Sequence, residues 1–177
     1  PVARSFVTPT RPARPPPPVR PTARFPPSRA LLDSRPHMSS DERESWLQRI
    51  GELVDRAAYR QALKVCDQAL VAHPDLAEAH DFRGLILCRM GRYGEALPSY
   101  DNAIRLEPEF VTALLDKAEL LVFYLNEDEE AVALTDRVLR LSSNELDAAH
   151  AHHLKGIAYA NLGLHEEALR NFEVAIS

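Results

Sequence analysis

Cysteine and long apolar runs are scarce in this sequence. Its 177 residues contain two cysteines, Cys66 and Cys88, and no Cys-x-x-Cys motif. These features exclude a disulfide framework and favour a reducing compartment. No apolar stretch approaches the roughly 18 residues that a membrane-spanning helix requires, and no secretory signal pattern is present. We therefore expect a cytoplasmic protein that has no membrane partner.

Sequence motifs of known catalytic sites are also absent. There is no Gly-rich phosphate loop, no G-x-S-x-G, no H-E-x-x-H and no plausible catalytic triad. The nearest approach to a metal site is the run His150, His152 and His153, but a zinc ion needs three or four ligands in tetrahedral geometry. No cysteine or clear carboxylate partner is placed beside them, so packing and surface histidines are favoured. We expect no enzyme activity, no cofactor and no bound metal.

Charge and proline are distributed unevenly along the chain. Residues 1–40 carry seven arginines, one aspartate and 11 of the 14 prolines. Residues 41–177 carry 14 lysines and arginines against 25 aspartates and glutamates. An acidic folded region would repel phosphates, so we expect no binding of nucleic acid.

Residues 1–40 are predicted to be a disordered tail, because proline removes backbone donors and disfavours helix in the residue before it. Within it, Pro15 to Arg20 fit the P-x-x-P-x-R pattern of ligands for SH3-type grooves. The arginine-rich composition also fits a transit peptide or a basic arm. The favoured interpretation is that this segment has no role, or that residues 1–37 are not part of the native protein and Met38 is its start.

The rest of the chain repeats itself with a period of 34 residues. The stretches GRYGEALPSYDNAI, from Gly91, and GLHEEALRNFEVAI, from Gly163, lie 72 residues apart, which is two periods and four inserted residues. At a shift of one period, eight columns align in phase. The aligned pairs are Trp46–His80, Ile50–Gly84, Leu53–Leu87, Tyr59–Tyr93, Ala62–Ala96, Cys66–Tyr100, Ala69–Ala103 and Pro74–Pro108.

These columns resemble the tetratricopeptide repeat family, whose 34-residue unit is a helix–turn–helix. The resemblance implies an all-α fold, a right-handed α-solenoid of about 3.5 to 4 repeats. The predicted units are residues 43–76, residues 77–110, a divergent unit over residues 111–145 and a truncated unit over residues 149–177. The third unit carries the acidic insertion Asn126 to Glu130, which we expect to displace its second helix. Because the fourth unit stops inside its second helix, the sequence is predicted to be a fragment.

The resemblance also implies where a partner would bind, since the first helices of these units line a concave groove that holds peptides. Helical geometry places this groove about 100° round from the core stripe. The predicted groove residues are Leu47, Val54, Asp81, Leu85, Leu115, Glu119, Val122, Phe123, His153 and Ile157.

The composition of the predicted groove indicates the kind of partner. The co-chaperone members of the family hold a C-terminal carboxylate with a clamp of Lys, Arg and Asn, which is absent here; the comparable positions are Leu47, Gly51, Phe82, Thr112 and Asp116. We therefore predict a scaffold or adaptor that binds a protein segment with apolar anchors and basic residues. The alternative is a regulatory or substrate-recruiting arm of a larger enzyme whose catalytic domain lies beyond Ser177.

A column of cations accompanies the repeat. Arg49, Arg83, Lys117 and Lys155 occupy a position where the family usually has leucine. The favoured interpretation is structural: their stems cover the edge of the core and their charged ends pair with neighbouring carboxylates. A basic ladder that binds a partner is the alternative.

Overall fold

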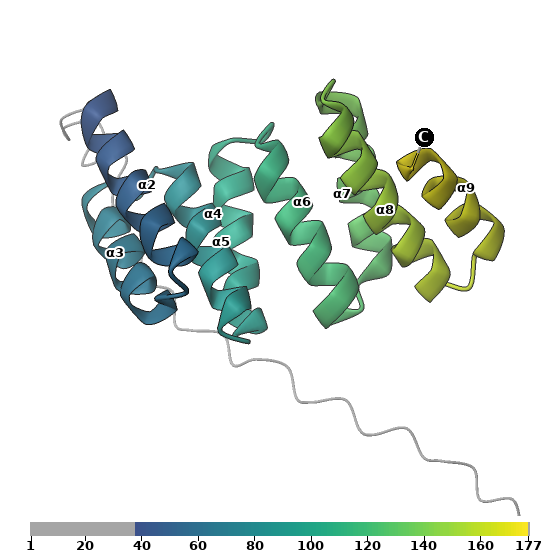
Figure 1. Ribbon diagram of the computed structural model, residues 1–177, viewed down its shortest axis with the longest axis horizontal. Helices are drawn as coiled ribbons and strands as arrows, with labels where there is room; N and C mark the ends of the chain where they lie inside the picture. Colours follow the sequence, from purple (N-terminus) through teal and green to yellow (C-terminus); the bar gives the residue numbers. More distant parts are fainter. Residues whose placement is uncertain (1–37, 177) are drawn as a thin grey trace, which may run out of the picture. The chain divides into compact units, whose positions relative to one another are not determined.

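The computed structural model describes residues 38–176, and these residues form α-helices and one π-helical turn without any strand (Figure 1). Met38–Ser177 is a compact unit separate from residues 1–37. The interpretations of the proline-rich segment lie outside the described residues. The elements are α2 (Ser40–Asp55), α3 (Tyr59–Ala72), α4 (Ala77–Arg89), α5 (Tyr93–Leu106), α6 (Val111–Leu120), the π-turn η1 (Leu121–Leu125), α7 (Asp128–Leu141), α8 (Glu145–Asn161) and α9 (His165–Ala175).

A side-chain cap sets the start of the first helix. α2 begins at Ser40, the last residue of the predicted proline-rich tail. The reason is Ser39, whose side chain accepts a hydrogen bond from the backbone N–H of Glu42 at 3.1 Å and so caps the helix. Met38 packs against the buried side chains of Ala69, Leu76 and Ala79.

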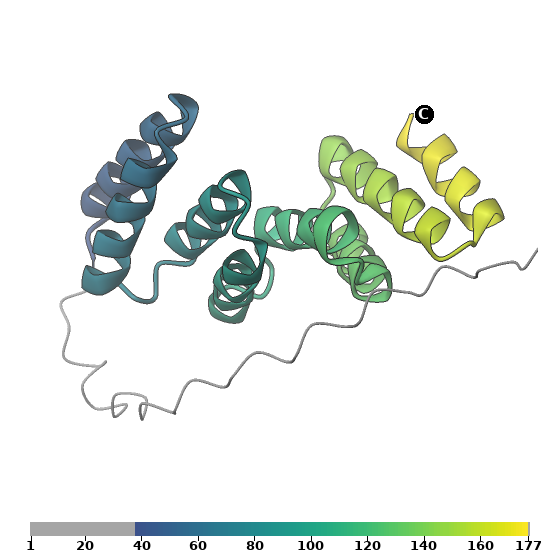
Figure 2. The ribbon, with the colours of Figure 1, turned by 90° about the horizontal axis from the view of Figure 1, so that it is seen from below.

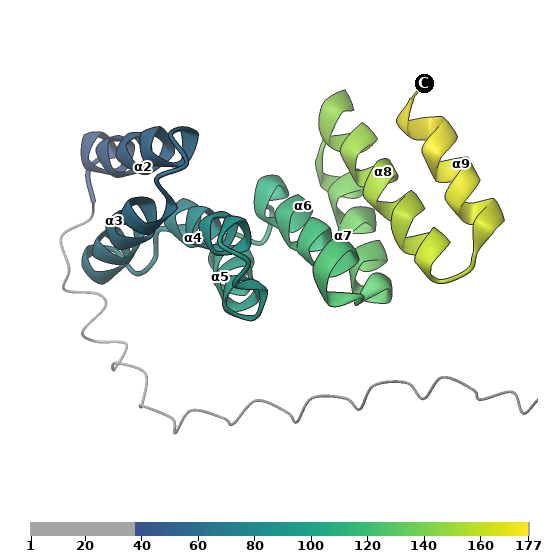
Figure 3. The same ribbon diagram turned by 60° about the horizontal axis from the view of Figure 1, so that its bottom comes forward.

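The helices stack in the order of the sequence (Figures 1 and 2). Each helix from α2 to α9 packs against the one before it and the one after it. In addition α2 contacts α4, α4 contacts α6, and α6 contacts α8. Each repeat is a pair of helices, and the pairs are α2–α3, α4–α5, α6–α7 and α8–α9. The first helices of successive pairs therefore lie side by side (Figure 3). Each pair depends on its neighbour to bury its apolar face, as in other solenoids.

The turn inside each pair has the same backbone conformation. Gly91 and Gly163 have φ angles of 72° and 79°, and Ala57 and Asn126 occupy the corresponding positions of the first and third pairs with φ angles of 54° and 55°. This left-handed residue allows the chain to reverse and the end of the first helix to be capped. In the first, second and fourth pairs the capping bond joins residues five apart: Ala58 to Leu53, Arg92 to Leu87 and Leu164 to Tyr159.

The third pair contains one more residue than the others. In the structure this extra residue lies within the helix and not in the turn that follows it. Here the backbone N–H of Glu127 donates to the carbonyl of Leu121, six residues earlier. The extra residue is absorbed by the π-turn η1, since π-helical bulges form where one residue is inserted into an α-helix. The predicted acidic insertion, Asn126 to Glu130, is therefore not a separate loop: its last three residues form the first turn of α7. Acidic side chains are favourable there because of the helix dipole.

Small residues set the distance between paired helices. A Cβ atom on Gly84 would lie 2.6 Å from the ring of Tyr100, and one on Gly156 would lie 2.6 Å from the ring of Phe172. On the second helices, Ala62, Ala96 and Ala131 are fully buried. Aromatic rings thus pack against bare backbone, so the glycines persist in helices although glycine costs roughly 1 kcal/mol of helix propensity relative to alanine.

Candidate functional site

The predicted groove residues all lie on the first helices of the pairs or on η1, and they differ in how much surface they offer. Phe123 and His153 are exposed. The half-buried members are Leu47, Val54, Leu85, Glu119 and Ile157. We call the surface formed by Leu47, Asp81, Leu85, Glu119, Phe123, His153 and Ile157 the first-helix face.

Three predicted groove residues offer almost no surface: Asp81, which is 7% exposed, and two apolar residues. Leu115 and Val122 are 6% and 3% exposed and belong to the central apolar cluster with Leu114, Ala118 and Leu154. Their burial has a local cause, because α6 is held between α4 on one side and α8 on the other. Both side chains therefore support the first-helix face from beneath.

Asp81 on α4 is the most unusual polar group of this face. Its side chain is 7% exposed, and its Oδ1 atom is fully buried with no hydrogen-bond partner among the described residues. Burial, with a smaller contribution from the charge of Asp116, raises the pKa of the Asp81 carboxyl to about 8. A buried carboxyl without a hydrogen bond costs free energy, so Asp81 does not stabilise this fold.

Two more carboxyls lie on α6: Asp116, whose charge acts on Asp81, and Glu119, whose charge acts on Asp116. Burial, with a contribution from the charge of Glu119, raises the pKa of Asp116 to about 6, while the guanidinium of Arg89 opposes the shift. Glu119 is half-buried, and its Oε2 atom lies 3.8 Å from Nε2 of His150 on α8. Asp81, Asp116 and Glu119 thus form an acidic cluster between α4 and α6. The sequence pattern identified Asp81 and Glu119 but treated Asp116 only as a departure from the carboxylate clamp.

The wall behind the acidic cluster is formed by Tyr100 and Cys88. The hydroxyl of Tyr100 on α5 donates to Sγ of Cys88 at 3.8 Å. Burial raises the pKa of the Cys88 thiol, and burial together with the charge of Asp116 raises the pKa of the Tyr100 hydroxyl. Both groups stay protonated near neutral pH, so neither adds charge to the cluster.

An aromatic cluster lies at the end of α6 and was not predicted in full. The rings of Tyr93 and Tyr124 stack with centroids 4.1 Å apart, and Phe123 meets Tyr124 edge-on at 6.4 Å. Phe123 and Tyr124 are 49% and 48% exposed. Sequence reasoning identified Phe123 but missed its neighbours, and the only signal was the one-residue slip in the repeat at Tyr124.

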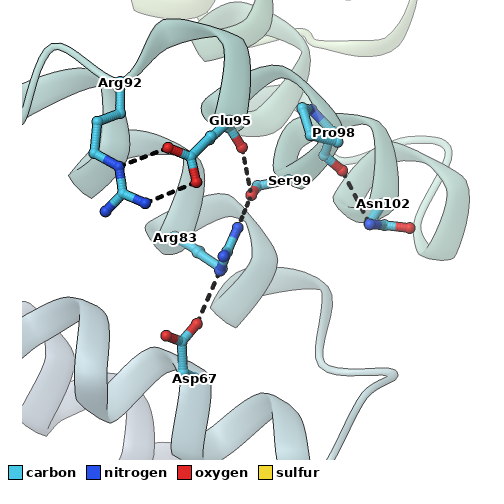
Figure 4. A network of polar contacts seen from close by, with 7 residues as sticks. All are labelled: Asp67, Arg83, Arg92, Glu95, Pro98, Ser99 and Asn102. Atoms are coloured by element: carbon cyan, nitrogen blue, oxygen red, sulfur yellow. Dashed lines mark hydrogen bonds and ion pairs between the residues drawn. The ribbon is translucent and has the colours of Figure 1, made fainter. Parts of the chain in front are cut away.

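Three of the four cations in the column are engaged within the protein, and Figure 4 shows one of them, Arg83. Nε of Arg83 donates to Oδ1 of Asp67 at 2.9 Å, and its Nη1 donates to Oγ of Ser99 at 2.8 Å. Nζ of Lys117 lies 2.8 Å from Asp101 and 2.6 Å from Glu130.

The third cation repeats this arrangement, since Lys155 pairs with Asp136. Each of these three cations reaches back to an aspartate at the same position of the preceding repeat. The structural interpretation is confirmed for Arg83, Lys117 and Lys155. Arg49, in the first repeat, makes no ion pair within residues 38–176.

The three histidines near residue 150 point to separate neighbours. Nδ1 of His152 lies 3.0 Å from Oδ1 of Asn171, and the ring of His153 lies 5.9 Å from that of Phe172. His150 faces Glu119 instead. Within residues 38–176, no three histidine, cysteine, aspartate or glutamate side chains converge where they could hold a metal ion. In the same part of the chain, no helix is long and apolar enough to cross a membrane.

Comparison with known protein families identifies the class of protein. Residues 77–110 and residues 149–177 each match a family model described as tetratricopeptide repeat. These two matches coincide with the pairs α4–α5 and α8–α9. The chain is therefore a tetratricopeptide repeat protein.

Solved structures agree with this class. MamA, from residue 41 to its end, from Desulfovibrio magneticus RS-1, superposes with a TM-score of 0.67 at 19% identity, over 78% of this chain and 76% of that one. PilW, described as a widely conserved type IV pilus biogenesis factor, superposes with a TM-score of 0.72 at 22% identity, over 78% of this chain and 62% of PilW. YrrB, described as a TPR protein with an unusual peptide-binding site, superposes with a TM-score of 0.66 at 21% identity, over 78% of this chain and 69% of YrrB. At these identities the likeness concerns the fold alone, and the predicted fold class, an all-α right-handed solenoid of helix–turn–helix repeats, is confirmed.

Proposed function

We propose that this protein is an interaction scaffold that binds a segment of another protein along its first-helix face. The observation that carries the proposal is the combination of exposed aromatic and half-buried apolar side chains with an acidic cluster on one continuous row of helices. Phe123 supplies an aromatic surface, and Leu85 and Ile157 supply aliphatic ones. Aromatic and apolar side chains near the centre of a contact supply most of the energy in protein interfaces.

The charge of the face favours a basic segment. Asp81, Asp116 and Glu119 lie on it, whereas Arg83, Lys117 and Lys155 are held in ion pairs between repeats. A partner with lysine or arginine beside apolar anchors would therefore complement this surface. A partner that presents a C-terminal carboxylate would not, because the positions of the family's clamp hold Leu47, Gly51, Phe82, Thr112 and Asp116.

The proposal contains no catalytic step and keeps a cytoplasmic location. Burial raises the pKa of the Cys66 thiol to about 12 and also raises that of Cys88, so both remain thiols rather than reactive thiolates. Both cysteines are free, as is usual in a reducing compartment. The fold is shared with YrrB, whose description names a peptide-binding site of its own.

A peptide selection tests the proposal. The full 177-residue chain would be screened against a random 15-residue peptide library, and enriched peptides would be titrated by fluorescence polarisation. Phe123→Glu places a charge on the first-helix face, whereas Val71→Glu places the same charge on α3, where Val71 is 81% exposed. We expect Phe123→Glu to weaken binding at least tenfold and Val71→Glu to change it less than twofold.

Two results would contradict the proposed function. One is a selection that enriches no peptide for the wild-type chain. The other is a set of enriched peptides that both variants bind as tightly as the wild type, which would place the binding surface elsewhere. Circular dichroism spectra of the two variants must match that of the wild type, so that loss of binding is not loss of fold.

A further inference from the structure

Asp81 is the polar group whose position the fold leaves unexplained. Its carboxyl is 7% exposed, and Oδ1 has neither a hydrogen bond nor an ion pair within residues 38–176. The other buried polar side chains have partners: Lys117 pairs with Asp101 and Glu130, and Asp128 accepts from Nδ2 of Asn161 at 2.9 Å. A group that lowers stability at one place on a binding face is a candidate for function.

The charged and titratable groups around Asp81 come from four helices. On α4 itself are Cys88 and Arg89, on α5 is Tyr100, on α6 are Asp116 and Glu119, and on α8 is His150, which faces Glu119. Arg89 is exposed and acts on Asp116, and within residues 38–176 no cation forms an ion pair with Asp81. The neighbouring carboxylates make the site more negative, so they do not offset the free-energy cost of burying Asp81.

We propose that Asp81 and Asp116, with Glu119 at the edge, form a recess that receives one lysine or arginine side chain of the bound segment. This inference rests on the proposed function and specifies one anchor of the partner. The incoming ammonium or guanidinium would donate to the carboxylates, and charge-assisted hydrogen bonds of this kind are the stronger ones in proteins. The aliphatic stem of the same side chain would lie against the half-buried side chains of Leu85 and Cys88.

A metal ion fits this cluster less well than a side chain does. Three carboxylates converging on one point would be needed, and no such group occurs among the described residues. A lysine or arginine side chain can instead reach separate carboxylates in turn, because its donors point in several directions.

The recess also predicts a proton exchange on binding. Burial, with the charge of Asp116, raises the pKa of the Asp81 carboxyl to about 8, so at pH 7 this carboxyl is mostly protonated in the free protein. A cation beside it favours the ionised form. Binding at pH 7 should therefore release up to about one proton, a signal that an apolar contact would not produce.

The test uses three synthetic 15-residue peptide libraries that differ only in their central residue, which is arginine, leucine or glutamate. Each would be titrated against the full chain, its Asp81→Asn and Asp116→Asn variants, and the control Glu129→Gln. Glu129 is exposed on α7, and its replacement removes one carboxyl, as the other two replacements do. Calorimetry in phosphate and in Tris buffer at pH 7 would count the protons released.

We expect the wild type to bind the arginine library at least tenfold more strongly than the leucine library and to bind the glutamate library least. Asp81→Asn should reduce the preference for arginine to less than threefold and abolish proton release, and Asp116→Asn should reduce both in part. The control should behave as the wild type does.

Two failures can be told apart. Equal binding of the arginine and leucine libraries, abolished for both by Phe123→Glu, would overturn the recess and leave the proposed function standing. Binding of no library would overturn the proposed function and the recess with it. An arginine preference that survives Asp81→Asn would place the cation site elsewhere.

Discussion

The ring of Tyr100 on α5 lies directly on the backbone of Gly84 on α4, so closely that a Cβ atom on Gly84 would lie 2.6 Å from the ring. Tyr100 is 1% exposed and is one of the largest fully buried side chains of the described residues. The same relationship joins Phe172 and Gly156 in the last pair. A ring packed against bare backbone brings the two helices of a pair close together, and it connects the second helix to the wall of the acidic cluster.

Replacement of Gly84 by alanine should destabilise the protein. Alanine gains helix propensity over glycine, but overpacking a closed core costs about 1–3 kcal/mol and outweighs that gain. We expect Gly84→Ala to lower the free energy of unfolding by about 1–2 kcal/mol. Gly51→Ala is the matched control, since nothing lies within 4 Å of its Cβ position, and it should stabilise by about 0.5–1 kcal/mol. Urea denaturation measures both, and an increase for Gly84→Ala would disprove the close contact.

Ala57 should accept glycine with a gain in stability. It occupies the left-handed turn position that Gly91 and Gly163 fill in other pairs, with a φ of 54°. A side chain with a Cβ atom is strained there, and glycine is not. We expect relief of this strain in Ala57→Gly to raise the free energy of unfolding by about 0.5–1 kcal/mol. The greater conformational entropy that glycine gives the unfolded chain offsets part of this gain. Gly91→Ala, the reverse change in the second pair, should lower the midpoint of thermal unfolding. Two shifts of the same sign would contradict this account of the turn.

Lys117 should contribute more to stability than an ordinary surface lysine. Its side chain is 11% exposed and lies between Asp101 and Glu130, each 53% exposed. Lys117→Met keeps the stem but removes both ion pairs, and we expect a loss of about 1 kcal/mol that shrinks in 1 M salt. Arg170→Met is the control, since Arg170 is 63% exposed in its pair with Glu167, and its cost should stay below about 0.5 kcal/mol. Equal losses measured in urea would show that the bridge between repeats adds nothing.

Asp81 should make stability depend on pH in a direction unusual for an aspartate. Its pKa in the folded protein is about 8 against an ordinary 3.8, so the folded state holds a proton that the unfolded state has released. Its contribution to stability is complete below pH 4 and is lost as the pH rises from 4 to 8. Asp116, with a pKa of about 6, adds to this loss between pH 4 and 6.

The variant Asp81→Asn isolates this effect, because an amide does not titrate. We expect its free energy of unfolding to equal that of the wild type near pH 4 and to exceed it increasingly up to pH 8, by more than about 1 kcal/mol. Thermal unfolding at several pH values between 4 and 8 measures this difference as a shift of the midpoint. Glu129→Gln, at an exposed carboxylate, should give a difference that does not change over this range. A constant difference between Asp81→Asn and the wild type would mean that Asp81 is already ionised at low pH.

The repeat period and the small-residue columns could be predicted from the sequence, because each depends on contacts within one helix pair. Gly84 recurs as Gly156 because the same close approach recurs in the last pair, and Ala96 recurs as Ala62, Ala131 and Ala168. The one-residue slip in the repeat at Tyr124 was also visible in the sequence, but the backbone structure that accommodates the inserted residue was not. A single inserted residue can become a loop or a π-turn, and the choice depends on which arrangement keeps Leu121 and Leu125 against α7 and α8.

The groove residues were predicted from the family resemblance together with helical geometry, and here the prediction had limited reach. Geometry assigns a direction to each side chain but not the amount of surface that neighbouring helices leave open. Leu115 and Val122 are buried, because α6 and η1 form an apolar cluster with α7 and α8 that includes both side chains.

The sequence by itself determined that the chain forms stacked helix pairs, because the 34-residue pattern of small, apolar and turn residues encodes local contacts that repeat in every unit. Only the tertiary structure decided which of its many charges matter. Asp67 and Asp101 receive a cation from the next repeat, whereas Asp81 receives none. That difference arises from side chains that different repeats bring together, and the electrostatic energy of a carboxylate depends on those neighbours and on its access to water.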